Sequence, residues 1–119
     1  GTVLIGANLT NANLADVDLS GKDVTGTVLI GANLTNANLA DVDFLRGPDL
    51  SGTILTGANL ANTHLVDADL SGKDLSGTNL SGADLRNADL SGTILTGANL
   101  QGADLRNAIL YCINHPICN

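Results

Sequence analysis

The chain has 119 residues, of which 44% are hydrophobic, yet aromatic residues contribute only 2%, and Met and Trp are absent. All twelve acidic residues are Asp, and the net charge of −7 argues against direct nucleic-acid binding, because contacts to the phosphate backbone rely on clustered Lys and Arg. No apolar run approaches the ~18 residues that a membrane span needs, and no signal peptide is visible at the start. These features leave a single, acidic domain without a span in this segment.

Leu recurs every five residues from Leu4, is interrupted once, and resumes without a gap from Leu50 to Leu110. We number each pentad so that this apolar residue occupies slot 3, as in Ala58–Asn62. Slot 3 is Leu at 20 of its 22 positions, and slot 1 is mostly a small residue. Slot 2 is Asp or Asn in 16 pentads, and slot 5 is Gly, Asn or Asp in 20. Such a regular period predicts a repeat architecture.

A period of five fits neither an α-helix, where it would distribute Leu over every side, nor a strand, where an odd period alternates the faces. A turn in every pentad removes the difficulty, because Gly, Asn and Asp in slot 5 tolerate positive φ. Slots 1 and 3 then point inward and slots 2, 4 and 5 outward. The text of Gly82–Ala88 returns twenty residues later, which indicates four pentads per coil, whereas the identical segments 1–18 and 26–43 are explained by duplication of whole pentads.

The A-(D/N)-L-X-X pattern resembles the pentapeptide repeat family over about 110 residues. The resemblance implies an all-β fold, a right-handed quadrilateral β-helix with Leu at its centre and Ala beneath it, here with about 5.5 coils. We place the solenoid at residues 1–111, with a one-residue register slip near 46–48, and a C-terminal cap at 112–119.

Two lysines, Lys22 and Lys73, occupy the inward slot 1. An unpaired ammonium inside the tube would be strongly unfavourable. We therefore expect each amine to reach out at the corner, toward Asp23 or Asp74 respectively.

The slip at Arg46-Gly47-Pro48 adds one residue directly after Phe44, the bulkiest residue of slot 3. We interpret it as a local bulge that makes room for the ring, because Pro removes a donor from a ladder. A short recognition loop is the alternative interpretation.

The tail leaves the pattern and is expected to cover the open end of the tube, with Ile113 and Ile117 folded over the last coil. Cys112 and Cys118 could form a disulfide, contributing about 2–3 kcal/mol by loop entropy, or remain free thiols. A disulfide would favour the periplasm or the thylakoid lumen, and free thiols the cytoplasm. Together with His115 the cysteines also read C-x2-H-x2-C, but a zinc site needs a fourth ligand. We expect no metal and no cofactor.

With four pentads per coil, outward residues twenty apart form columns. One column carries Asp49, Asp69 and Asp89, which is either a solvated acidic face or a docking strip for a partner. The opposite column is rich in Asn, interpreted as amides paired between coils. A third column combines Asp43, His64, Asp84 and Asp104 with Arg86 and Arg106, and the fourth carries Ile54 and Ile94.

No catalytic constellation is visible: His64 stands in an outward slot 2, and no Ser, Cys or carboxylate has a base and an orienting group of the triad kind. The first hypothesis is a non-enzymatic structural or protein-interaction module whose protein partner is unknown. The second is implied by the resemblance, because some family members are acidic rods that mimic duplex DNA and bind type II topoisomerase. The third is a segment of a larger, cyanobacterial-type protein, since Gly1 begins directly in the repeat. We adopt the first hypothesis with the third attached.

Overall fold

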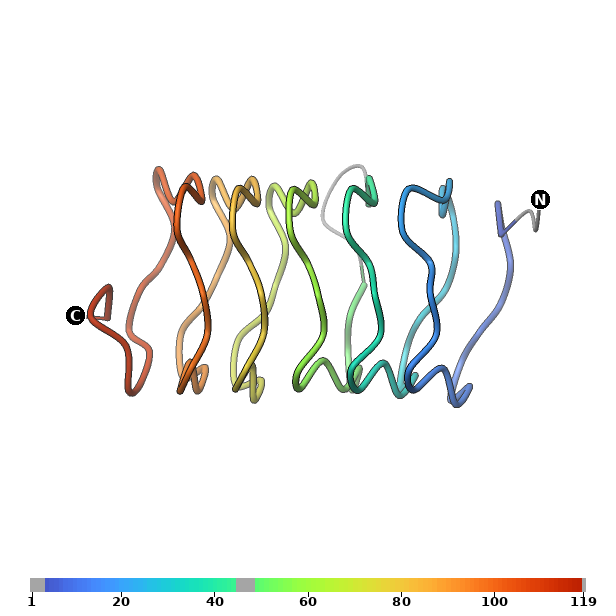
Figure 1. Cartoon of the computed structure of the whole chain (residues 1–119), viewed down its shortest axis with the longest axis horizontal. Coiled ribbons are helices and arrows are strands. Elements are labelled where there is room, and N and C mark those ends of the chain that lie inside the picture. Colours follow the sequence, from blue (N-terminus) through green and yellow to red (C-terminus); the bar gives the residue numbers. More distant parts are fainter. Residues whose placement is uncertain (1–3, 45–48, 119) are drawn as a thin grey trace.

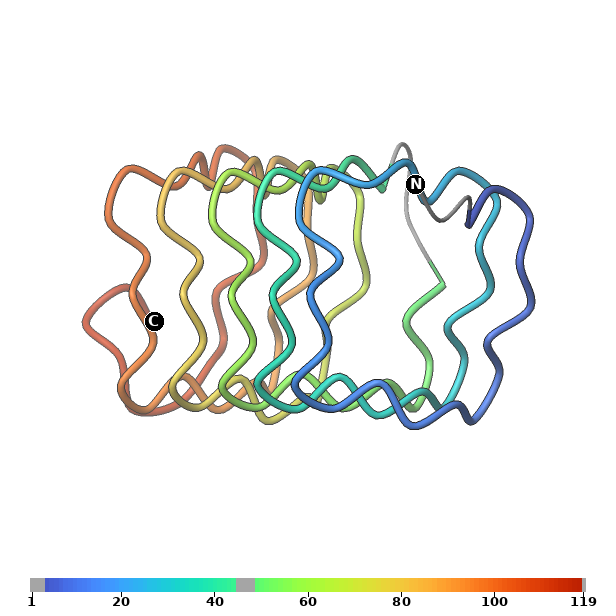
Figure 2. The same ribbon diagram turned by 45° about the vertical axis from the view of Figure 1, so that its right-hand side comes forward.

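The chain winds into a right-handed square coil whose turns stack along one axis (Figure 1). The computed structural model describes residues 4–44 and 49–118. The molecule measures 40 × 22 × 20 Å along its principal axes. In the described ranges there is no α-helix, hence none that could cross a membrane, and no strand longer than one residue. Single slot 2 residues instead pair with the next coil as isolated parallel bridges, and Figure 2 shows the coils lying side by side.

The separation of the bridged residues gives the length of each coil. It is 20 residues for Asp69 and Asp89, and 21 for Asn38 and Asn59. The longer coil has the register expected from one inserted residue, although the predicted bulge at 46–48 lies outside the described residues. Phe44 just before it is partly buried against the core. The last bridge joins Ile94 to Ile113 over 19 residues, so the ladder includes Ile113, and the cap turn follows it.

Each pentad satisfies its five backbone N–H groups in a fixed way. Slot 2 donates to the preceding coil, slots 3 and 5 donate to the following coil, and slot 1 closes the corner. Slot 4 donates to the slot 2 side chain of its own pentad. The N–H groups of Ala58–Asn62 donate, in order, to the oxygens of Leu55 (3.0 Å), Ala37 (2.9 Å), Asn79 (2.7 Å), Asn59 Oδ1 (3.1 Å) and Ser81 (2.9 Å).

The corners have the features of type II turns. The slot 1 N–H donates to the slot 3 carbonyl three residues earlier, and slot 5, the third residue of the turn, has positive φ. Within the described ranges, Asn114 in the cap is the sole residue with positive φ outside slot 5. The prediction that Gly, Asn and Asp form the corners is therefore confirmed.

The core is the column of slot 3 leucines. From Leu34 to Leu95 these side chains are at most 3% exposed, whereas Leu4 and Leu110 near the two ends are partly buried. Slot 1 alanines pack beside them. Buried slot 1 threonines donate their hydroxyls to slot 3 carbonyls, as Thr63 does to Leu60 (2.7 Å), so no described buried side-chain atom lacks a partner.

Candidate functional site

The predicted acidic strip, Asp49, Asp69 and Asp89, lies on one face of the coil. Asp69 and Asp89 are bridged neighbours, and Asp49 lines a shallow open depression together with Asp69. Asp49 and Asp69 are exposed and Asp89 is half-buried. The structure therefore brings the three carboxylates onto consecutive coils.

Serines in slot 4 hold these carboxylates in place. The Oδ1 of Asp49 accepts from the Oγ (2.6 Å) and the N–H (3.1 Å) of Ser51. Asp69 has the same bonds to its own serine, Ser71, at 2.6 and 3.0 Å. The serine hydroxyl first, and the backbone N–H second, hold the pKa of Asp49 and of Asp69 below the usual range. The strip is thus a fixed row of anions, and the serines that fix it were not singled out from the sequence.

Lys73 lies beneath the strip rather than beside Asp74, as the sequence had predicted. Its Nζ donates to the carbonyl of Leu50 and, at 3.3 Å, to that of Thr53. Burial lowers the pKa of Lys73, while the charges of Asp69 and Asp49 act in the opposite direction. The prediction was wrong about the partner because the amine reaches back to the preceding coil instead of turning out at its own pentad.

Lys22 lies in a second shallow depression, lined also by Asp23, Asp41 and Asp43. This position agrees with the expected approach to Asp23. The charge of Lys22 also contributes, as a minor cause after the bonds to Ser20, to the lowered pKa of Asp18.

The third column is a chain of alternating charges. His64 Nδ1 lies 3.1 Å from Asp43 Oδ1, and its Nε2 lies 3.5 Å from Asp84 Oδ2. Arg86 Nη2 lies 2.7 Å from Asp84 Oδ2, and the same pairing recurs at 2.6 Å twenty residues later, between Arg106 and Asp104. The bonds of Arg106 lower the pKa of Asp104 to about 2. These acids are thus largely neutralised within the column.

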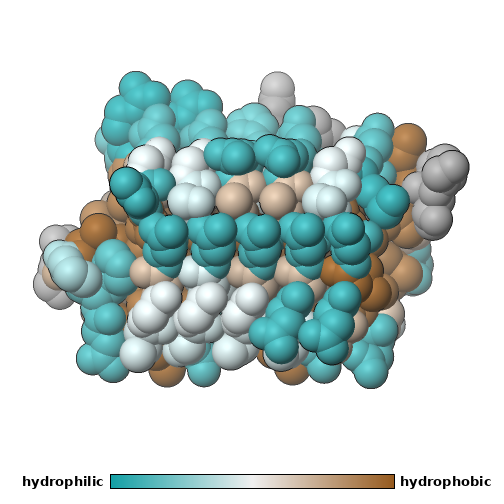
Figure 3. Space-filling model, in the orientation of Figure 1, coloured by the Kyte–Doolittle hydropathy of each residue, from teal (hydrophilic) through white to brown (hydrophobic). Residues whose placement is uncertain are grey.

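The Asn column differs from its interpretation as amides paired between coils. The Oδ1 of Asn38 accepts from the N–H of Ala40 (3.1 Å), and Asn59 and Asn99 bond in the same local way. The Asx bond within the pentad explains why slot 2 prefers Asn or Asp. Figure 3 shows a continuous hydrophilic row along one face, with hydrophobic surface at both ends.

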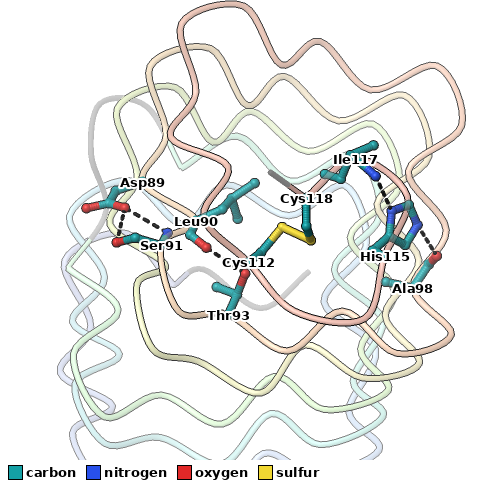
Figure 4. Close-up of a disulfide and its surroundings, with 9 residues drawn as sticks. All are labelled: Asp89, Leu90, Ser91, Thr93, Ala98, Cys112, His115, Ile117 and Cys118. Carbon is teal, nitrogen blue, oxygen red and sulfur yellow. Dashed lines mark hydrogen bonds between the residues drawn. A yellow bond between two sulfur atoms is a disulfide. The ribbon is translucent and has the colours of Figure 1, made fainter.

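The cap folds over one part of the last coil (Figure 4). Cys112 and Cys118 are joined through their sulfurs, with Cα atoms 5.0 Å apart. His115 Nε2 lies 3.2 Å from the carbonyl oxygen of Ala98, and its Nδ1 accepts from the N–H of Ile117 at 3.3 Å. Ile117 packs on the core. Sulfurs bonded to one another cannot ligate zinc, and the described residues contain no cluster suited to a metal.

Several outward apolar side chains are exposed, including the predicted Ile54 (47%) and Ile94 (36%). Tyr111 is the most exposed of them at 68%, and Ile113 reaches 50%. Sequence analysis overlooked Tyr111 and placed Ile113 over the last coil, because the 19-residue closing coil was not visible in the repeat.

Comparison with known proteins agrees with this geometry. The family model described as Pentapeptide repeats matches residues 7–44, 45–74 and 74–110 in eight copies. A search of the curated proteins finds no match.

Among solved structures, the chain is 32% identical to HetL of Nostoc sp. strain PCC 7120, a pentapeptide repeat protein involved in heterocyst differentiation regulation (TM-score 0.42, covering 92% of this chain and 60% of that one). It is 36% identical to Rfr23 of Cyanothece 51142 (TM-score 0.35, 88% and 61%). It is 26% identical to a pentapeptide repeat protein of the Arabidopsis thaliana thylakoid lumen (TM-score 0.43, 89% and 63%). The chain thus spans about three fifths of the length of these proteins.

Proposed function

Because this chain belongs to the pentapeptide repeat family, whose members are generally structural or interaction modules, we propose that it is a non-enzymatic module that binds a protein partner through the acidic strip. The observation that carries the proposal is the fixed carboxylate row of Asp49, Asp69 and Asp89. In each of them Oδ1 is bonded to a serine hydroxyl at 2.6 Å, while Oδ2 takes no bond within the described residues.

A fixed row favours binding for an entropic reason. A side chain that is already held in one rotamer loses little freedom when a partner contacts it, and that loss is one of the main terms opposing association. The strip is built on bridged coils rather than on a loop, so its spacing is fixed as well. Charged groups in such a row also favour the encounter with a basic partner.

The strip keeps a negative charge despite the nearby lysine. The amine of Lys73 points to the carbonyls of Leu50 and Thr53 rather than forming an ion pair with the strip. The column of Arg86 and Arg106, by contrast, pairs its own acids. The acidic strip is therefore the face best suited to recognise a basic surface.

The test replaces the three strip residues by Asn, which keeps the Asx bond because Asn59 makes the same bond in slot 2. A matched control changes the charge equally on the other faces, at positions whose Oδ1 also binds a slot 4 hydroxyl. The control is Asp18→Asn, Asp23→Asn and Asp74→Asn. In a pull-down followed by identification of the captured protein, we expect the strip variant to lose a partner that the wild type and the control retain. Equal recovery by both variants would contradict the proposal.

A second candidate function is that of an acidic rod that mimics duplex DNA and binds type II topoisomerase. The net charge of −7 and the elongated shape favour it. The arginines and His64 that alternate with acids on one face weigh against it, because they interrupt the negative surface. A gyrase supercoiling assay discriminates the two. We expect no effect at stoichiometric excess, and inhibition or protection would favour the second candidate.

The compartment is also part of the proposal. The joined pair Cys112 and Cys118 supports an oxidising location such as the periplasm or the thylakoid lumen. Trapping the thiols with an alkylating agent at the moment of cell lysis tests this, and two alkylated cysteines in the native protein would point to the cytoplasm instead. The proposed role as a segment of a larger, cyanobacterial-type protein is tested by looking for further repeats in the full gene.

A further inference from the structure

Four exposed apolar side chains gather at one corner of the last two coils. Seven large hydrophobic side chains are exposed in the described part of the chain, and four of them form this group, which we call the apolar corner. Its members are Ile94 (36% exposed), Ile109 (45%), Tyr111 (68%) and Ile113 (50%). Single exposed apolar residues are ordinary, but a contiguous group marks an interaction surface.

The corner is held rigidly by the backbone. Side chains alternate through this segment, with Cys112 buried between the exposed Tyr111 and Ile113. The carbonyl of Tyr111 accepts from the N–H of Gly92 at 2.7 Å, and that of Ile113 accepts from the N–H of Leu95 at 3.1 Å. Ile113 is also bridged to Ile94. Tyr111 is therefore fixed with its ring outward on the ladder and does not belong to a mobile tail.

The apolar corner runs directly into the acidic strip. Ile109 is the bridged neighbour of Asp89, and Asp89 is the bridged neighbour of Asp69. Along the coil axis the surface thus presents an apolar group and then carboxylates, one per coil, at steps of about 4.8 Å. An aromatic residue next to a row of charges is the composition of a binding hot spot with a charged extension.

We propose that this surface binds a basic amphipathic α-helix of a partner protein, lying along the coil axis. An apolar side chain of the helix packs on Tyr111 and Ile109, and Lys or Arg residues on its following turns lie over the acidic strip. The inference rests on the proposed function, because it names the class of partner for the same strip.

The spacing of the carboxylates selects a helix over a strand. A helix presents one residue per turn on a given face, at steps of about 5.4 Å, close to the step of the coils. An extended strand presents every second residue, at steps of about 6.6 Å, and falls out of register sooner. Charge complementarity selects the basic residues, and the exposed ring of Tyr111 selects an apolar anchor at one end.

The probe is a synthetic helical peptide of about 16 residues with Leu and Phe in its first turn and Arg once per turn on the same face thereafter. Its controls are a peptide of the same composition in scrambled order and one with Pro in the middle, which breaks the helix. Binding is measured by fluorescence anisotropy at low and high salt. We expect the scrambled and Pro-containing peptides to bind at least tenfold more weakly, and high salt to weaken binding. Equal affinity for the Pro peptide, or no binding of the helical peptide, would overturn the proposal.

Two exposed-surface variants separate this inference from the proposed function. The corner variant is Ile109→Ser with Tyr111→Ser, and its matched control is Ile5→Ser with Ile54→Ser, since those side chains are exposed elsewhere. We expect at least a tenfold loss of peptide affinity for the corner variant and less than a twofold change for the control. Thermal unfolding checks that both variants remain folded.

The outcomes are distinguishable. If the corner variant binds both the peptide and the natural partner as the wild type does, while the strip variant loses the partner, this inference fails and the proposed function stands. If the corner variant loses the peptide but the strip variant keeps it, the basic character of the partner is wrong. If neither variant changes any binding, both the inference and the proposed function fail.

Discussion

The side-chain amine of Lys73 donates to the carbonyl oxygen of Leu50, a slot 3 residue 23 positions earlier. The hydroxyl of Thr27 makes the same connection to Leu4, also 23 residues earlier, at 2.7 Å. A lysine in the inward slot thus performs the task of a threonine there, which is to bond a carbonyl of the preceding coil. The coil tolerates a polar slot 1 residue when that residue brings such a donor.

Replacing Lys73 tests this equivalence. Lys73→Thr keeps a donor for Leu50 and removes an amine whose pKa is lowered by burial, whereas Lys73→Met keeps the bulk and removes the donor. We expect the Thr variant to be more stable than the Met variant by about 1 kcal/mol, the usual contribution of one hydrogen bond. Urea denaturation measures the difference. A Met variant as stable as the Thr variant would show that the bond to Leu50 contributes nothing.

The corner glycines differ in what lies over them. A Cβ on Gly57 would lie 2.2 Å from Asn36 Oδ1, whereas a Cβ on Gly77 would find its nearest atom, in Gly57, at 3.8 Å. Both have positive φ, so alanine at either position should destabilise by about 1–2 kcal/mol. Gly57→Ala should cost more, because the side chain of Asn36 must also move. Adding Asn36→Gly should remove this excess in a double-mutant cycle, and a zero coupling energy would contradict the contact.

Acid should weaken the fold at low pH only. The bonds from slot 4 hold the pKa of Asp74 below its usual range, and the bonds of Arg106 bring that of Asp104 to about 2. Because the folded pKa lies below the unfolded value of about 3.9, this stability is complete above that value and is lost as pH falls through the folded pKa. Urea midpoints should therefore stay level from pH 7 to 5 and fall from pH 4 toward 2. A midpoint that is unchanged at pH 2 would be inconsistent with these bonds.

The disulfide should stabilise the cap more than the coil. Cys112→Ser with Cys118→Ser removes the link between the ladder and the turn that carries Ile117. We expect a loss of about 2–3 kcal/mol if the whole coil unfolds cooperatively. Hydrogen exchange should speed up first near Leu95, whose N–H donates to Ile113. Counting free thiols in unreduced, denatured protein provides the control, and two free thiols would refute the bond.

The sequence alone predicts most of the fold, because one inward residue in five and one turn former in five leave a square coil as the simplest solution. Leu60 in the core and Asn62 at a corner follow directly from the period. Face membership follows as well once the slip is counted, as the pairing of Asn38 with Asn59 shows.

The details of the site depend on distances that the period does not contain. The contacts of His64 with carboxylates on both neighbouring coils arise from side-chain reach across the stack. The apolar corner arises because the tail closes its coil in 19 residues, which moves Ile113 beside Ile94. The direction of Lys73 depends on which carbonyl lies within its reach.

The most direct measurement of the central claim, a rigid coil built from one repeating bond pattern, is amide hydrogen exchange along the middle coils. The N–H groups of Asn59, Leu60 and Asn62 donate to neighbouring coils, whereas that of Ala61 donates only to the side chain of Asn59. We predict slow exchange in slots 2, 3 and 5 and faster exchange in slot 4, repeated every five residues. Uniform exchange, or protection with the 3.6-residue period of a helix, would contradict the square coil and the docking face built on it.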